Sequence, residues 1–222
     1  MALLASDVMS RAAVLLNDAA QATFTNVVLL PKLRIALEDL QNQLAEHGAS
    51  VIKRKTSSPI TISAGATEVT SYPADFLTPI DLYERAPGGT DDDWLPMSEV
   101  DFLPNRQASD MLEQWSWVED EVHFVGATQD RQVRMDYFAQ ITSIVSENTS
   151  LPVTGSCNFL AYRTAAIQAA ILKNNDLAGS CAAEAEKAMQ TFLNSRAKQR
   201  QAVPVRRKPF RYGVMLRRKR RF

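Results

Sequence analysis

The chain has 222 residues, of which 45% are hydrophobic and 23% charged, and its 25 basic and 25 acidic residues cancel to no formal net charge. This size allows one compact domain or two small ones with buried cores. No apolar run reaches the roughly 20 residues that a transmembrane helix needs, and the N-terminus does not resemble a signal peptide. We therefore expect a soluble protein of a reducing cytoplasm, with Cys157 and Cys181 reduced and buried.

The zero net charge conceals an uneven distribution along the chain. From Arg196 onward there are 12 basic residues and no acidic one, which leaves 13 basic and 25 acidic residues, a net charge of −12, in residues 1–195. Such asymmetry is typical of an interaction tail attached to an acidic body.

The first 48 residues are predicted to form two amphipathic helices. Ser6 is the candidate cap of the first helix, which has apolar residues at helical spacing after it. Pro31 is expected in the first turn of the second helix, where no backbone donor is lost. Gly48 is expected to end that helix. The second helix carries an apolar stripe formed by Leu29, Leu30, Leu33, Leu37, Leu40 and Leu44.

After Gly48 the hydrophobic period becomes two and β-branched residues are frequent, which predicts strands between residues 51 and 142. A hairpin is expected around Trp115 and Trp117, one of which should lie in the core and the other at its rim. Residues 86–93 contain no apolar residue to anchor them, so we expect an exposed loop there. The strand segments are SVIKRKT, PITISAG, SYPADFLTPIDLYER, WSWVEDEVHFVG and RQVRMDYFAQI.

Two further helices are predicted after a linker, SENTSLPVTGS. The first should bury Leu160, Thr164, Ile167, Ala170 and Ile171, and the second, with Asp176 as candidate cap, should bury Cys181, Ala185, Ala188, Met189 and Phe192. The expected fold is α+β, with a small helical bundle from the two ends of the chain (residues 1–50 and 151–200). Inserted between them is an antiparallel β-sandwich or half-barrel (51–150), and an extended basic C-terminal arm follows (201–222).

Sequence motifs for catalysis, cofactors or metals are missing. His47 and His123 do not stand in a metal-ligand pattern, and no serine-hydrolase, phosphate-binding, zinc-protease or dinucleotide motif occurs. Three aspartates before Trp94 could offer oxygens to a hard cation, but the spaced ligands of a calcium loop are lacking. We interpret them as a solvated acidic loop and a candidate contact with other subunits or tail proteins, formed by Asp91, Asp92, Asp93 and Trp94. We predict no catalytic residue, no cofactor and no metal.

The C-terminal segment RRKPFRYGVMLRRKRRF mixes cations with aromatic and aliphatic residues. Like-charge repulsion should keep it from folding alone. Binding to phosphates would not require the hydrophobic residues, whereas a groove on another protein would use them. Contact with nucleic acid and a simple solubility tail are the alternatives. The candidate docking residues are Arg206, Arg207, Lys208, Phe210, Arg211, Tyr212, Met215, Leu216, Arg217, Arg218, Lys219, Arg220, Arg221 and Phe222.

Several of these segments together resemble a family of viral proteins. The opening DVMSRAAVLLNDAAQATFTNVVLLPKLRIALEDLQNQLAE, the element TSYPADFLTPIDLYER, the strand VRMDYFAQI and the helix LAYRTAAIQAAIL are similar to those of head-to-tail adaptor (connector) proteins of tailed bacteriophages. Tyr72 stands where that family usually has leucine. The resemblance covers roughly residues 5–195.

The resemblance implies a structural protein of the virion neck, assembled in the host cytoplasm and without catalytic activity. Such adaptors form a ring, commonly dodecameric, beneath the portal, extend the DNA channel used in genome ejection and offer a surface to tail or nozzle proteins. The implied partners are other copies of the chain, the portal protein, which the C-terminal arm would contact, a downstream tail protein, and double-stranded DNA passing without sequence recognition. No membrane is implied. An acidic channel lining would let DNA slide, because it repels phosphates.

Two rival functions remain from the residues alone. The basic tail could make the chain a nucleic-acid-binding protein, for which a steep loss of affinity with salt is the expected signature. The strand region could instead carry a small carbohydrate- or metal-binding enzyme, although the sequence offers no clustered histidines or paired carboxylates for it.

Overall fold

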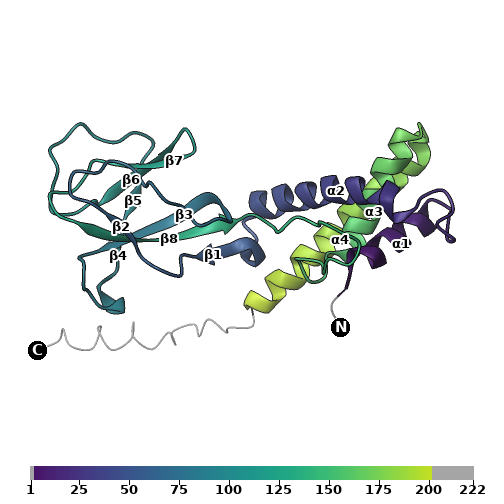
Figure 1. Ribbon diagram of the computed structural model, residues 1–222, viewed down its shortest axis with the longest axis horizontal. Coiled ribbons are helices and arrows are strands. Elements are labelled where there is room, and N and C mark those ends of the chain that lie inside the picture. Colours follow the sequence, from purple (N-terminus) through teal and green to yellow (C-terminus); the bar gives the residue numbers. More distant parts are fainter. Residues whose placement is uncertain (1–2, 202–222) are drawn as a thin grey trace, which may run out of the picture.

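The computed structural model describes residues 3–201, and the side chains of residues 3–196. It is an α+β fold, as predicted. The helices, which come from both ends of the sequence, lie at one end of the molecule, and the strands lie at the other (Figure 1). Two hydrophobic clusters form, one among the helices and one among the strands. The predicted arm falls outside the described residues from 202 onward.

The helical end is built around one central helix, α3. Its neighbours are α1, α2 and α4, all of which pack against it. Alanines allow this close approach, since Ala161, Ala165 and Ala169 are buried along α3. The helices are α1 (Ala5–Leu15), α2 (Asn26–Glu46), α3 (Cys157–Ile171) and α4 (Asn175–Gln201).

Two details of the first helices differ from the prediction. Leu4, and not Ser6, is the N-cap of α1, because a bridge between Leu4 and Ser150 fixes where the helix starts. The backbone N–H of Leu4 donates to the Asp7 carboxylate at 2.9 Å. Pro31 lies inside α2 and not in its first turn, since the helix already begins at Asn26.

The earlier start of α2 follows from the loop before it. The Asp18 carboxylate accepts hydrogen bonds from the backbone N–H groups of Ala22, Thr23 and Phe24. These bonds favour the charged carboxylate and lower the pKa of Asp18, the bond from Phe24 contributing most. The chain is thereby turned into α2 several residues before the proline.

The larger sheet is antiparallel and has β8 near its centre. Its order is β1-β8-β3-β4, and β2 also pairs with β8. A one-turn 3₁₀ helix, Ser50–Ile52, replaces the start of the first predicted strand, because Ile52 is buried in the helical cluster. The strands are β1 (Lys53–Lys55), β2 (Ile60–Ile62), β3 (Phe76–Arg85), β4 (Leu95–Pro96) and β8 (Arg131–Ala139).

A second, three-stranded sheet lies beside the first, in the order β5-β6-β7. It comprises β5 (Ser98–Glu99), β6 (Gln114–Val118) and β7 (Glu121–Phe124). The pairing of β5 with β6 is parallel, which the prediction of a wholly antiparallel region did not include. The predicted hairpin is confirmed: Trp115 is buried in the core of the strands, and Trp117 packs partly buried at its rim.

The late helices confirm most of the predicted stripes. In α4 the buried residues include Cys181, Ala185, Met189 and Phe192, while Ala188 is partly buried. In α3 Leu160 and Thr164 are buried and Ile167 is partly buried, but Ala170 and Ile171 are exposed. Asn174, and not Asp176, caps α4: its side-chain oxygen accepts from the backbone N–H of Leu177.

Candidate interaction surfaces

The loop at residues 86–93 is exposed, as predicted. The expectation that nothing anchors it is wrong, because contacts at its base hold it to the larger sheet. The indole of Trp94 lies 4.4 Å from the Arg85 guanidinium and 4.6 Å from that of Arg134, both within cation–π distance. Arg85 also donates from Nη1 to the backbone oxygen of Thr90 at 2.9 Å. Arg85 belongs to β3 and Arg134 to β8, so the base of the loop is held against the larger sheet.

The three aspartates of this loop have different environments. Asp93 Oδ2 accepts from the backbone N–H of Thr90 at 2.6 Å and from its hydroxyl at 3.0 Å. The backbone hydrogen bond is the main cause of the lowered pKa of Asp93. All three residues are exposed, and the side chain of Asp91 is 93% exposed although it lies 3.6 Å from Arg85. The loop thus presents three carboxylates to solvent on an anchored turn.

Groups that could do chemistry do not converge in the described part of the chain. Among those residues, no three His, Cys, Asp or Glu side chains lie close enough together to hold a metal ion. His47 is exposed at the end of α2 and His123 is half-buried in β7. Cys157 and Cys181 are both free and buried, and burial raises the pKa of each thiol, which disfavours the thiolate that a nucleophile requires.

One apolar surface is a ridge on the outer side of α2. Val27, Pro31 and Ile35 stand at intervals of four residues, all are exposed, and Val27 is 82% exposed. The exposed Val145 adjoins this ridge, because Arg34 donates to the backbone oxygens of Ile144 and Val145. We call these residues the α2 ridge.

A second apolar surface is a groove of about 680 Å³ between α3 and α4. At its margin Arg163 is paired with Asp39 of α2 at 2.7 Å. Ile171 is 58% exposed, and Leu172, which follows it, is also exposed. The lining beyond Arg163 consists of Ala166, Ile167, Ala170, Ile171, Ala178, Gly179 and Ala182. We call this surface the α3–α4 groove.

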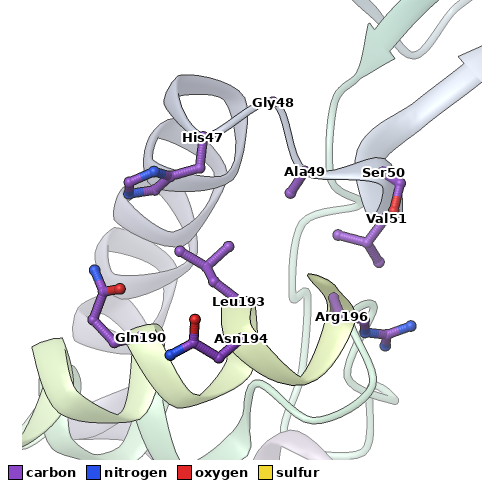
Figure 2. A pocket seen from close by; sticks show the side chains of 9 residues that line it. All are labelled: His47, Gly48, Ala49, Ser50, Val51, Gln190, Leu193, Asn194 and Arg196. Atoms are coloured by element: carbon purple, nitrogen blue, oxygen red, sulfur yellow. The ribbon is translucent and has the colours of Figure 1, made fainter. Parts of the chain in front are cut away.

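The last described turns of α4 lie beside the link between α2 and the strands. Figure 2 shows Gln190, Leu193 and Asn194 of α4 on the side of the helix that faces His47 and this link, around a cavity of about 290 Å³. Arg196 donates to the backbone oxygen of Thr154 at 3.1 Å. The cavity brings amides and one imidazole together but no acid–base pair.

Among the described residues, no helix is both long enough and apolar enough to cross a membrane.

The predicted arm residues fall outside the described part of the chain. Of the other predicted contact residues, Asp91, Asp92 and Asp93 are exposed and Trp94 is half-buried. Sequence reasoning missed both apolar surfaces, although Val27 and Ile35 lie off the leucine stripe and could have signalled the ridge.

Comparison with protein-family models finds no match, and neither does comparison with curated proteins.

Proposed function

We propose that this protein is a head-to-tail adaptor of a tailed bacteriophage, without catalytic activity. Copies of the chain would form a ring beneath the portal, extend the DNA channel and offer an attachment surface to tail proteins. The observation that carries the proposal is the pair of exposed apolar surfaces on the helical end, the α2 ridge and the α3–α4 groove. The resemblance of residues 5–195 to such adaptors supports it independently.

Two different apolar surfaces are what a ring subunit needs. In a closed ring each subunit meets one neighbour through one surface and the next neighbour through another. Exposed apolar patches on a soluble chain commonly mark protein contacts. The small residues of the α3–α4 groove allow a side chain of a neighbour to approach the helix backbones closely. The ridge residues Val27 and Ile35 have the apolar character that such a groove would receive.

The C-terminal segment supplies the attachment to the portal in this proposal. It follows α4 in the chain and combines cations with aromatic residues. An arm that orders on binding can cover a large surface, although the loss of conformational freedom weakens each contact. Repetition around a ring compensates, because linked contacts bind far more tightly than single ones. The anchored loop with Asp91 and Asp92 would serve the downstream partner.

Nucleic-acid binding is the second candidate, because the last 27 residues carry 12 cations and no acid. A chain that acts by gripping phosphates should lose DNA affinity steeply as salt rises, and that loss should map to residues 205–222. An adaptor should show little DNA affinity when it is assembled, because residues 1–195 carry a net charge of −12.

The variant Ile171→Lys should prevent ring assembly on purified portal. Burying a lysine in an apolar contact is unfavourable, whereas a cation at the C-terminal end of α3 suits the helix dipole, so the subunit should still fold. Sedimentation velocity of the portal–protein mixture should show at least a tenfold loss of the complex. Leu95→Lys, at an apolar position on β4 that is 47% exposed, is the matched control and should assemble normally. Normal assembly of Ile171→Lys would remove the groove from the subunit contact, and failure of the unmodified chain to bind portal would refute the function.

A further inference from the structure

A groove on the three-stranded sheet combines apolar and acidic groups. It has a volume of about 450 Å³ and includes Asp101, Phe102, Val118, Glu119 and His123 in its lining. Phe102 is 88% exposed, and Val118 is exposed on β6. The ring of Phe102 therefore stands in solvent with carboxylates close to it. We call this surface the β6–β7 groove.

The surroundings of this groove are strongly acidic. Asp101 and Glu119 line the groove, and no lysine or arginine is among its lining residues. The hairpin turn between the two strands is itself acidic, with Glu119, Asp120 and Glu121 in succession. His123 lies 3.9 Å from the Glu121 carboxylate. A ligand for this groove should therefore carry cations next to aromatic or aliphatic groups.

Residues 206–222 of the same chain have that composition. They contain nine basic residues and no acidic one, and between the cations stand Phe210, Tyr212, Val214, Met215, Leu216 and Phe222. Cations satisfy the carboxylates of the groove, and an aromatic ring can cover Phe102 with a favourable ring–ring contact. Both features of the groove are thus matched by one segment.

The segment is also long enough to reach the groove of its own chain. Leu193 and Arg196 of α4 line a cavity with Val51, and Val51 lines another cavity together with Ala139, the last residue of β8. The nine residues of β8 span about 30 Å toward the far end of the sheet. Residues 202–222 extend to about 70 Å at most when the chain is fully stretched. About nine residues are needed to cover one such strand length, so residues 202–211 can bridge it and leave residues 212–222 to occupy the groove.

We propose that in the unattached subunit the distal part of this segment, from Tyr212 onward, docks in the β6–β7 groove of its own chain. Docking covers Phe102 and neutralises the acidic hairpin. It also shields the cations from nucleic acid, which such basic segments otherwise bind without sequence preference. A partner with a stronger site for the segment then displaces it. This inference goes beyond the proposed function and holds whether or not that partner is a portal.

Photo-crosslinking of the full-length chain tests the docking. With p-benzoylphenylalanine in place of Tyr212, mass spectrometry should find crosslinks to peptides that contain Phe102 or residues 116–124. The double variant Asp101→Lys with Glu119→Lys should lower the crosslink yield at least fivefold and raise the affinity for double-stranded DNA. The matched control is Asp91→Lys with Asp92→Lys, which changes the net charge equally on the 86–93 loop and should leave the yield unchanged.

The outcomes separate docking in the groove from simple charge attraction. An equal loss of yield in both double variants, or crosslinks that avoid the groove, would overturn the proposal. A mixture of ¹⁵N-labelled and unlabelled chains distinguishes the source of the segment, and crosslinks between differently labelled chains would overturn docking within one chain. Binding of the same variants to portal is measured separately: the groove variant should still attach, so a failed crosslink leaves the adaptor function untouched and failed attachment leaves the docking untouched.

Discussion

Deleting residues 205–222 should abolish attachment of this protein to the portal while leaving the rest of the chain folded. The described hydrophobic clusters are built from residues between Ala5 and Phe192, so the deletion removes no described core residue. What it removes is nine cations and the hydrophobic residues between them. Because the proposed ring would multiply the contact of each arm, the loss of all arms should weaken attachment at least 100-fold. Co-sedimentation with purified portal measures this, and thermal unfolding checks the fold.

A charge-only variant separates the two components of the arm. Replacing Arg217, Arg218, Lys219, Arg220 and Arg221 by glutamine keeps the length of the chain and retains Phe210, Tyr212, Met215 and Leu216. We expect attachment to be reduced but still measurable, since the hydrophobic residues can still enter a groove. A shortened chain that bound portal as tightly as the full one would contradict the role of the arm.

The second large effect is expected at Glu84, which is 1% exposed in β3. Its carboxylate accepts from the backbone N–H groups of Leu112 and Glu113 at 3.0 and 2.7 Å, and from Arg131 Nε at 2.9 Å. The variant Glu84→Ala should lower the free energy of unfolding by about 3–5 kcal/mol, because it leaves Arg131 buried without its partner. Two backbone donors also lose their acceptor.

Urea unfolding at neutral pH measures this difference. Arg106→Ala is a suitable control, since it breaks an exposed ion pair with Glu113 at 2.9 Å and should change the free energy by less than about 1 kcal/mol. If Glu84→Ala were no more destabilising than this control, the carboxylate would not be what ties β3 to the segment before β6.

Local sequence patterns predicted the elements well where one face of an element is buried. The alternation in β8 placed Val133, Met135, Tyr137 and Ala139 on one side, and all four are buried. Local patterns could not predict which elements pack against one another when they lie far apart in the sequence. Trp94 meets Arg134 of β8, 40 residues away, and for that reason the loop at 86–93 is anchored although it contains no large apolar residue of its own.

The candidate surfaces were predictable only in part, for a related reason. The charge of the C-terminal segment is visible in the sequence and singles it out without a structure. Ile171, by contrast, falls at helical spacing and was expected in the core. Periodicity cannot tell an apolar residue covered by α4 from one left free for another molecule. The structure makes that distinction, since Ile171 is exposed beside the α3–α4 groove.

Electron microscopy of the full-length protein mixed with purified portal tests the adaptor account most directly. We expect a ring of subunits coaxial with the portal channel, with helical ends in contact around the ring and density for the C-terminal segments running onto the portal. Particles in which the protein is absent, or bound singly and off the axis, would contradict it.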